Sequence, residues 1–274
     1  MNDHFPSETT MPRYPLLISS HSEAVDLWPI TAHFLQKNFP TSLFKIYLGA
    51  NGEHNRNAYA PSGWNFLYFG RDESFSKSLH SYLEAIEDEY VLLMLDDFVI
   101  LERTDPVKLT EAFRFLRESG GVYLRLVPNP GGDHHLQDHF YRINIAGGAA
   151  YATSLQMAIW NRRFLMKLLS YDFSPWEFEI KAGKTAEALE HKNDFYVSHI
   201  PIVHYTHIVE KGKFFPFLRQ LIEEEGLVLE SSRAWWTHEE LQQLREHPLK
   251  AWVRSKLSPA WHNRIRRIFF KEPL

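Results

Sequence analysis

The 274-residue sequence contains no cysteine, which excludes a disulfide framework and thiolate chemistry and fits a reducing compartment. It also lacks the run of roughly 18 apolar residues that a membrane-spanning helix needs. The N-terminus shows no basic segment followed by an apolar one, so no signal peptide is predicted. Hydrophobic content of 44% and charged content of 23% exclude general disorder. We therefore expect a folded cytoplasmic protein.

Charge is distributed unevenly along the chain. Residues 248–274 carry a charge of +6, so the net charge of −4 leaves −10 for the rest. In this tail, cations alternate with large apolar residues, as in helices that lie on anionic membranes. We expect peripheral contact with the inner face of the cytoplasmic membrane; an ordinary helical cap with a solvated basic face is the alternative. Nucleic-acid binding is excluded, because the remaining chain is acidic and has no recognition motif.

Strand-like and helix-like segments alternate through the first half of the chain. Apolar runs predict strands at residues 15–20, 44–50, 64–70, 90–100 and 121–127. Helical spacing of apolar residues predicts helices over 73–87 and around 109–116. Ser20 and Glu23 have the spacing of a capping box, which predicts a helix directly after the first strand. This alternation is typical of an α/β sheet with helices on its faces.

The second half is less regular. Residues 128–150 are rich in Gly, His and Asn and predict a long loop. A strand at 152–160 and a helix at 161–169 should follow, and then a short helix that begins at Pro175. The last predicted elements are one or two strands over 196–209, a helix over 214–226, and helical structure over 231–274.

Two adjacent aspartates, Asp96 and Asp97, interrupt the apolar run YVLLMLDDFVI. In open α/β sheets, ligands bind beyond the carboxyl ends of the strands. Two carboxylates this close repel each other, and burial would raise the pKa of one unless a cation neutralises them. Mg²⁺ and Mn²⁺ prefer carboxylates together with phosphate oxygens. The pair therefore predicts either a divalent-metal site or a solvated turn that ends the strand.

Several stretches together resemble bacterial glycosyltransferases with the GT-A fold, of the kind encoded in capsule, lipopolysaccharide and exopolysaccharide pathways. They are LISSHSEAVDLWPITAHFLQ, FKIYLGAN, SFSKSLHSYLEAIEDEYVLLMLDDFVI, and SLQMAIWNRRFLMKLL with SPWEFE. The resemblance covers residues 14–225 and implies a GT-A-like, Rossmann-type mixed sheet flanked by helices. It implies a catalytic domain at 1–230, with a nucleotide-sugar half at 14–127 and an acceptor half at 128–230. A basic helical extension would follow at 231–274.

The resemblance also implies an enzyme: an inverting, metal-assisted transfer of a sugar from a nucleotide-sugar donor to a saccharide or lipid-linked acceptor. Many family members carry Asp-x-Asp, and here Leu95 stands in the place of the first acid. Asp97 would then bind Mn²⁺ or Mg²⁺ and the diphosphate, with Asp96 beside the donor, and the departure puts the need for metal in question. His204 or His207 would add a metal ligand, although a histidine on an apolar strand is also a common core residue.

The remaining candidate residues divide between acceptor and donor. Glu177 is preferred over Glu179 as the base that deprotonates the acceptor, although a first-turn glutamate also simply suits the helix dipole. Trp176, Tyr141 and Arg142 are candidates for acceptor contacts, with a core role as the alternative for Trp176. The donor candidates are Ser19, Ser20 and His21 after the first strand, Arg71 and Asp72 after the third, and Lys211 and Lys213, with surface turns as the alternative for the last two groups.

Two other functions compete with the transferase. A non-catalytic polysaccharide-binding or assembly subunit could keep the fold, and the departure at Leu95 favours it. A sugar nucleotidyltransferase also ends a strand in metal-binding acids. It usually has a basic, glycine-rich loop after the first strand, which SSHSEA does not provide.

Overall fold

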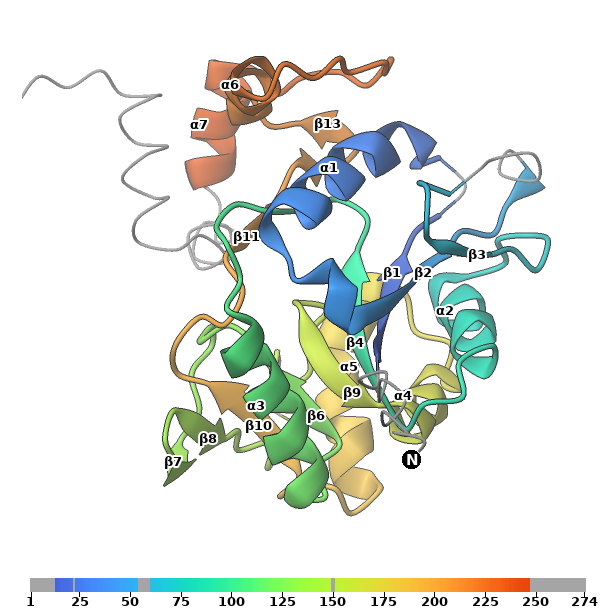
Figure 1. Ribbon diagram of the computed structural model, residues 1–274. Helices are drawn as coiled ribbons and strands as arrows, with labels where there is room; N and C mark the ends of the chain where they lie inside the picture. Colours follow the sequence, from blue (N-terminus) through green and yellow to red (C-terminus); the bar gives the residue numbers. More distant parts are fainter. Residues whose placement is uncertain (1–12, 22, 54–59, 149–150, 247–274) are drawn as a thin grey trace, which may run out of the picture.

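The computed structural model describes residues 13–21, 23–53, 60–148 and 151–246, and its centre is a nine-stranded mixed sheet (Figure 1). The strand order is β3-β2-β1-β4-β9-β6-β10-β8-β7. Helices cover both faces of the sheet. The predicted α/β class, with a mixed sheet flanked by helices, is confirmed.

Four parallel strands form one half of the sheet. They are β1 (Tyr14–Ser19), β2 (Phe44–Gly49), β3 (Asn65–Leu67) and β4 (Tyr90–Leu95). Ser19 is in register with both Gly49 and Leu95, and Gly49 with Leu67, so all four strands end at the same edge. The runs of β1 and β4 are apolar almost throughout because these central strands are covered on both faces, whereas β3 at the edge is partly exposed.

The other half of the sheet is mixed. Strand β9 (Ala158–Asn161) lies antiparallel between β4 and β6 (Tyr123–Arg125), so β6 points in the same direction as β4. Beyond β6 come β10 (Phe195–Ser198), β8 (Phe140–Arg142) and β7 (His134–Gln137). The prediction of one long loop over 128–150 was wrong for β7 and β8. These strands form because β8 pairs with the distant β10, which the local composition does not reveal.

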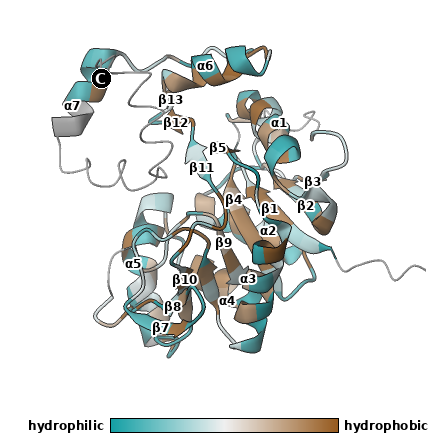
Figure 2. Ribbon diagram, turned by 60° about the vertical axis from the view of Figure 1, so that its left-hand side comes forward, coloured by the Kyte–Doolittle hydropathy of each residue, from teal (hydrophilic) through white to brown (hydrophobic). Residues whose placement is uncertain are grey.

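The two faces of the sheet have separate cores. Alternation along β4 directs Leu92 and Met94 into one core and Val91 and Leu93 into the other. The first core lies under α1 (Trp28–Asn38) and α3 (Pro106–Glu118). The second lies under α2 (Phe75–Glu84), α4 (Arg162–Leu169) and α5 (Pro175–Ala188). Figure 2 shows the same layering, with hydrophobic strands inside and hydrophilic helix surfaces outside.

A third core joins the C-terminal part of the described chain to the α1 region. Strand β5 (Phe98–Ile100) pairs with β11 (Tyr205–His207), and a hairpin of β12 (Val209–Glu210) and β13 (Lys213–Phe214) follows. Helices α6 (Phe217–Glu224) and α7 (His238–Glu246) complete this part. Its apolar residues pack on the outer side of α1. The predicted helix at 214–226 therefore starts later, because Lys213 and Phe214 are paired in the hairpin.

The predicted capping box at Ser20 and Glu23 was also wrong. A 3-10 turn, η1 (Val25–Leu27), precedes α1, which begins at Trp28 with Pro29 in its first turn. The Ser20 hydroxyl donates to the Asp96 carboxyl group and does not cap a helix N-terminus. A long-range carboxylate thus wins over the local capping interaction.

No helix in the described segments is long and apolar enough to cross a membrane. The basic tail that was predicted to contact a membrane falls at 248–274, outside the described residues.

Candidate functional site

The two aspartates lie where the chain leaves the nine-stranded sheet. They form the turn between β4 and β5, and β5 pairs with β11 in a separate two-stranded sheet. The backbone N–H of Asp96 still donates to the Ser19 carbonyl at 3.2 Å, so the turn stays against the end of β1. The turn therefore lies at the carboxyl edge of the parallel strands, where ligands of such sheets bind.

Asp96 is a buried carboxyl group with a defined hydrogen-bond environment. Its side chain is only 6% exposed, and Oδ2 accepts a hydrogen bond from the Ser20 hydroxyl at 2.5 Å. The indole N–H of Trp28 donates to the same hydroxyl oxygen at 2.9 Å, and the Thr31 hydroxyl donates to the Asp96 carbonyl. Burial raises the pKa of Asp96, while His21 and the Ser20 hydrogen bond oppose that shift. The predicted Ser20, His21 and Asp96 are therefore brought together.

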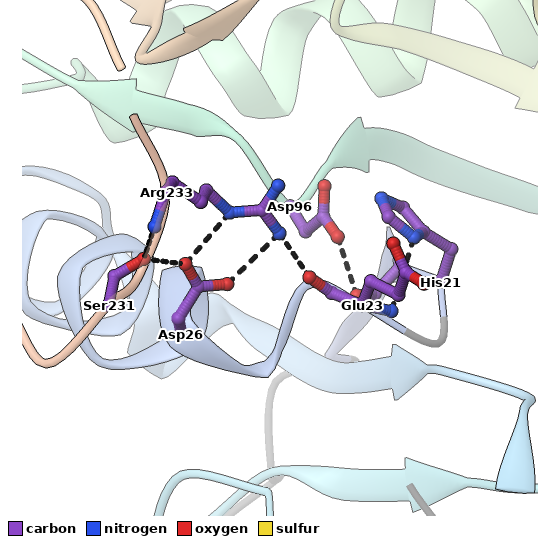
Figure 3. A network of polar contacts seen from close by, with 7 residues as sticks. His21, Glu23, Asp26, Asp96, Ser231 and Arg233 are labelled. Atoms are coloured by element: carbon purple, nitrogen blue, oxygen red, sulfur yellow. Dashed lines mark hydrogen bonds and ion pairs between the residues drawn. The ribbon is translucent and has the colours of Figure 1, made fainter. Parts of the chain in front are cut away.

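An arginine from the C-terminal segment joins this edge (Figure 3). The Arg233 guanidinium binds the Asp26 carboxylate with two nitrogens, Nε to Oδ2 at 2.8 Å and Nη2 to Oδ1 at 3.0 Å. The Ser231 hydroxyl donates to the same carboxylate at 2.5 Å, and Nη2 also donates to the Glu23 carbonyl. Sequence reasoning missed Arg233, because it is separated from Asp26 by more than 200 residues. No local signal marks it.

The strand register distinguishes the two candidate histidines. His207 is paired with Phe98, and the Ile208 N–H donates to the Asp97 carbonyl at 2.9 Å, so His207 lies beside the aspartate turn. Its Nε2 is 3.6 Å from Glu210 Oε2. The His204 carbonyl instead bonds Leu101, four residues past Asp97, which is about 13 Å along the strand. Its Nδ1 is 3.7 Å from Glu102.

The structure thus brings His207 and not His204 to Asp97. In the described part of the chain, no three His, Asp or Glu side chains form a set that could hold a metal ion by themselves. A metal ion at Asp97 would therefore also need oxygen ligands from a bound substrate, as Mg²⁺ has when one or two carboxylates and a substrate phosphate hold it.

The ends of β2 and β3 are held together by side chains that follow them. Asn51 is buried; its Oδ1 accepts from the Phe69 N–H at 2.8 Å, and its own N–H donates to the Tyr82 hydroxyl. Asp72 accepts from the Ser78 hydroxyl at 2.7 Å, whereas Arg71 is exposed and lies 3.6 Å from Glu53. Sequence reasoning missed Asn51, although its position directly after the second strand was a usable signal.

The start of α5 lies beside the start of α2. The Ser74 hydroxyl donates to Asp172 at 2.5 Å, and the Ser76 hydroxyl donates to the Phe173 carbonyl at 2.7 Å. Helix α2 follows the turn after β3, so these contacts hold the first turn of α5 near the carboxyl edge of the sheet. Trp176 in that turn is 53% exposed, which excludes the core role considered for it.

The two candidate bases have different environments. Glu177 forms a capping box with Ser174 and lies 2.6 Å from the Lys181 ammonium group, and these contacts lower its pKa to about 2. Glu179 is only 5% exposed and accepts a hydrogen bond from the Leu155 N–H at 3.0 Å. Glu177 is thus the one that faces solvent at the start of the helix, and Glu179 supports the loop before β9.

Two other pairs of candidates lie on elements that do not include the aspartate turn, the β12–β13 hairpin and β8. Lys213 binds Glu240 at 2.5 Å and lies over the Trp236 ring, while Lys211 is exposed in the hairpin turn between β12 and β13. Tyr141 stacks on His199 with ring centroids 3.4 Å apart. Tyr141 and Arg142 belong to β8, four strands from β4 and therefore about 19 Å away across the sheet.

Comparisons with known proteins give distant structural similarity alone. No protein-family model and no curated protein match the sequence. S. aureus TarS, a glycosyltransferase, has 16% identity and a TM-score of 0.46 over 90% of this chain and 44% of that chain. TarS 1–349 in complex with UDP-GlcNAc gives 15% and 0.46 over 74% of this chain and 60% of that one.

A CMP:2-keto-3-deoxy-manno-octonic acid synthetase complexed with CTP has 11% identity and a TM-score of 0.45. The match covers 78% of this chain and 99% of the synthetase chain. The present chain therefore spans less than half of that TarS chain and nearly all of the synthetase. With TM-scores below 0.5, these similarities do not assign a reaction to this chain.

Proposed function

We propose that this protein is a glycosyltransferase that moves a sugar from a nucleotide-sugar donor to a saccharide or lipid-linked acceptor in cell-surface polysaccharide synthesis. One observation carries the proposal. The Asp96–Asp97 turn ends a buried parallel strand at the carboxyl edge, with the Asp96 carboxyl bonded to the turn after β1. A diphosphate and its counter-ion need carboxylates, cations and backbone of this kind at such an edge.

The donor would lie across the ends of β1, β2 and β4. Asp96 and Ser20 shape the floor beneath it, and Asn51 holds the turns beside the base and ribose. Asp97, with His207 nearby, would hold Mn²⁺ or Mg²⁺, which supplies charge neutralisation for the leaving diphosphate when bound. This keeps the metal residues of the sequence prediction, apart from His204.

The acceptor would lie at the start of α5. Glu177 is the proposed base there, and it must lose the Lys181 contact when acceptor binds, because a carboxylate with a pKa near 2 is a poor base at neutral pH. Attack of the acceptor oxygen from that side forms the new glycosidic bond as the bond to the diphosphate breaks, with inversion at the anomeric carbon. The exposed ring of Trp176 can stack on a sugar of the acceptor.

A thermal-shift screen tests the proposal. The ligands are UDP-, GDP-, CMP- and dTDP-linked sugars, each with and without Mn²⁺, and the corresponding nucleoside triphosphates. We expect one nucleotide-sugar class to raise the melting temperature, more with Mn²⁺, and Asp97→Asn to remove the shift. Asp88→Asn is the control, because Asp88 is exposed at the opposite end of β4.

Two outcomes would overturn the transferase. If none of the ligands raises the melting temperature, even at concentrations far above millimolar, the result would favour the non-catalytic binding or assembly subunit. A triphosphate that binds better than its sugar conjugate, with pyrophosphate released from the triphosphate and a sugar phosphate, would identify a nucleotidyltransferase.

A further inference from the structure

The segment after α6 returns to the proposed donor site, and Arg233 is the residue that reaches it. Arg233 and Asp26 are only 16% and 18% exposed as side chains. The Arg233 guanidinium binds Asp26 and the Glu23 carbonyl, in the same connection between β1 and α1 that carries Ser20, the hydrogen-bond donor to Asp96. Figure 3 shows it between Asp26 and Asp96.

Asp26 and Ser231 fix the orientation of this guanidinium. Nε and Nη2 both bind the Asp26 carboxylate, which the Ser231 hydroxyl also holds. Nη1 donates to no acceptor among the described residues, although the arginine as a whole is paired. A planar guanidinium that is fixed along one edge keeps the N–H groups of its third nitrogen in a defined direction.

The charges around Arg233 leave room for an anion. Asp26 binds Nε and Nη2 of the guanidinium and leaves Nη1 for another acceptor. A diphosphate that binds together with a divalent cation at Asp97 would add little net charge. A phosphate oxygen can accept from Nη1 without breaking the pair with Asp26, and charge-assisted hydrogen bonds of this kind are strong.

We propose that Arg233 binds a phosphate oxygen of the donor diphosphate through Nη1, with Asp26 and Ser231 as the residues that orient it. This inference rests on the proposed function and extends it to residues 227–237, which become part of the donor site. The alternative is a purely structural arginine that attaches this segment to η1.

Binding titrations with and without the phosphates separate these roles. UDP, GDP, CDP and dTDP are compared with their nucleosides, in Mg²⁺, on wild type, Arg233→Gln and Arg233→Lys. We expect Arg233→Gln to weaken the nucleoside diphosphate by about 10- to 100-fold and to leave the nucleoside within twofold. Arg233→Lys keeps the positive charge but loses the planar set of N–H donors. Its affinity for the nucleoside diphosphate should therefore lie between those of wild type and Arg233→Gln.

Arg219→Gln is the matched control, because Arg219 is an exposed arginine of the same C-terminal part that lies over the Trp235 ring. It should leave both affinities unchanged. Ser231→Ala should weaken the diphosphate less than Arg233→Gln does, without affecting the nucleoside. If Arg233→Gln does not fold, Arg233→Lys carries the comparison.

The outcomes distinguish this inference from the proposed function. Equal affinities of wild type and both Arg233 variants for the diphosphate, with binding still lost in Asp97→Asn, would overturn the role of Arg233 alone. If Arg233→Gln weakens binding of the nucleoside and of the nucleoside diphosphate equally, the role of Arg233 would also be overturned. That result is expected when the variant only loosens residues 227–237. Failure of wild type to bind any of the four diphosphates would overturn both.

Discussion

Asp96 shows, at the scale of one residue, how burial of an ionisable carboxyl group opposes stability at neutral pH. Its carboxyl group is buried, and its hydrogen bond to Ser20 is short, yet burial still raises its pKa. A raised pKa means that the folded state binds the proton more tightly than the unfolded state. This contribution to stability is complete below the unfolded pKa of 3.8 and is lost as the pH rises through the folded pKa.

We expect Asp96→Asn to raise the free energy of unfolding at pH 7, because a neutral amide of the same shape replaces a buried charge. The gain over wild type should shrink toward pH 3.5, where wild-type Asp96 is mostly protonated in both states. Urea unfolding at the two pH values measures it. If Asp96→Asn is less stable than wild type by the same amount at both pH values, the charge of Asp96 does not destabilise the folded state.

The ion pair of Glu177 and Lys181 also belongs to this scale. The ammonium group is the main cause of the low Glu177 pKa. If Glu177 is the base, Lys181→Met should raise its pKa and move the acidic limb of the kcat/KM profile to higher pH. Glu177→Gln should lower kcat by about 10²- to 10⁴-fold.

Lys184→Met is the control for that profile, because Lys184 is exposed on the same helix and has no ion pair with Glu177. An acidic limb that is the same in wild type and Lys181→Met would assign the base to another residue. Full turnover in Glu177→Gln would have the same meaning.

At the scale of one element, the N-terminus of α5 is built by local chemistry. The Ser174 hydroxyl accepts from the Glu177 N–H, the Glu177 carboxylate accepts from the Ser174 N–H, and Pro175 occupies the first turn. This is a reciprocal capping box, which satisfies two backbone donors that the helix itself cannot pair. The box also fixes the position of Glu177 at the proposed acceptor side.

Ser174→Ala should therefore lower the free energy of unfolding by about 1 kcal/mol, as loss of an N-cap hydroxyl usually does. Ser170→Ala is a suitable comparison, since Ser170 is exposed at the end of α4 and bonds the Lys167 carbonyl only. Chemical denaturation of both variants measures the difference. Equal stabilities would show that the box adds nothing at this position.

At the scale of the whole molecule, the C-terminal part is joined to the N-terminal half by an apolar core. Phe214, Leu218 and Leu221 pack with Leu27 and Phe34 of the α1 region. Glu225 adds polar contacts to Lys37 and His33 of α1. A chain that is joined in this way should unfold as one unit.

Leu218→Ala should lower the free energy of unfolding by about 2–5 kcal/mol, because Leu218 is fully buried in this core. The transition should stay single when it is followed by tryptophan fluorescence and by far-UV circular dichroism. Val228→Ala is the control, since Val228 is 81% exposed. Two separate transitions in Leu218→Ala would show that the C-terminal part folds independently.

Local patterns in the sequence predicted the four parallel strands of the sheet and the two carboxylates that follow β4. Those features depend on local apolar runs and on side-chain alternation, so residues 15–20 and 44–50 were predicted almost to their observed bounds as β1 and β2. The start of α5 at Pro175 was predicted for the same reason, because capping involves neighbours only.

The tertiary structure alone decided which polar groups meet. Ser20 was predicted as a helix cap, but it bonds Asp96, and the register between β5 and β11 selects His207 over His204. Arg233 joins the edge only because α6 and the third core return the chain to η1. Such contacts depend on how distant elements pack, and no local pattern of residue types contains that information.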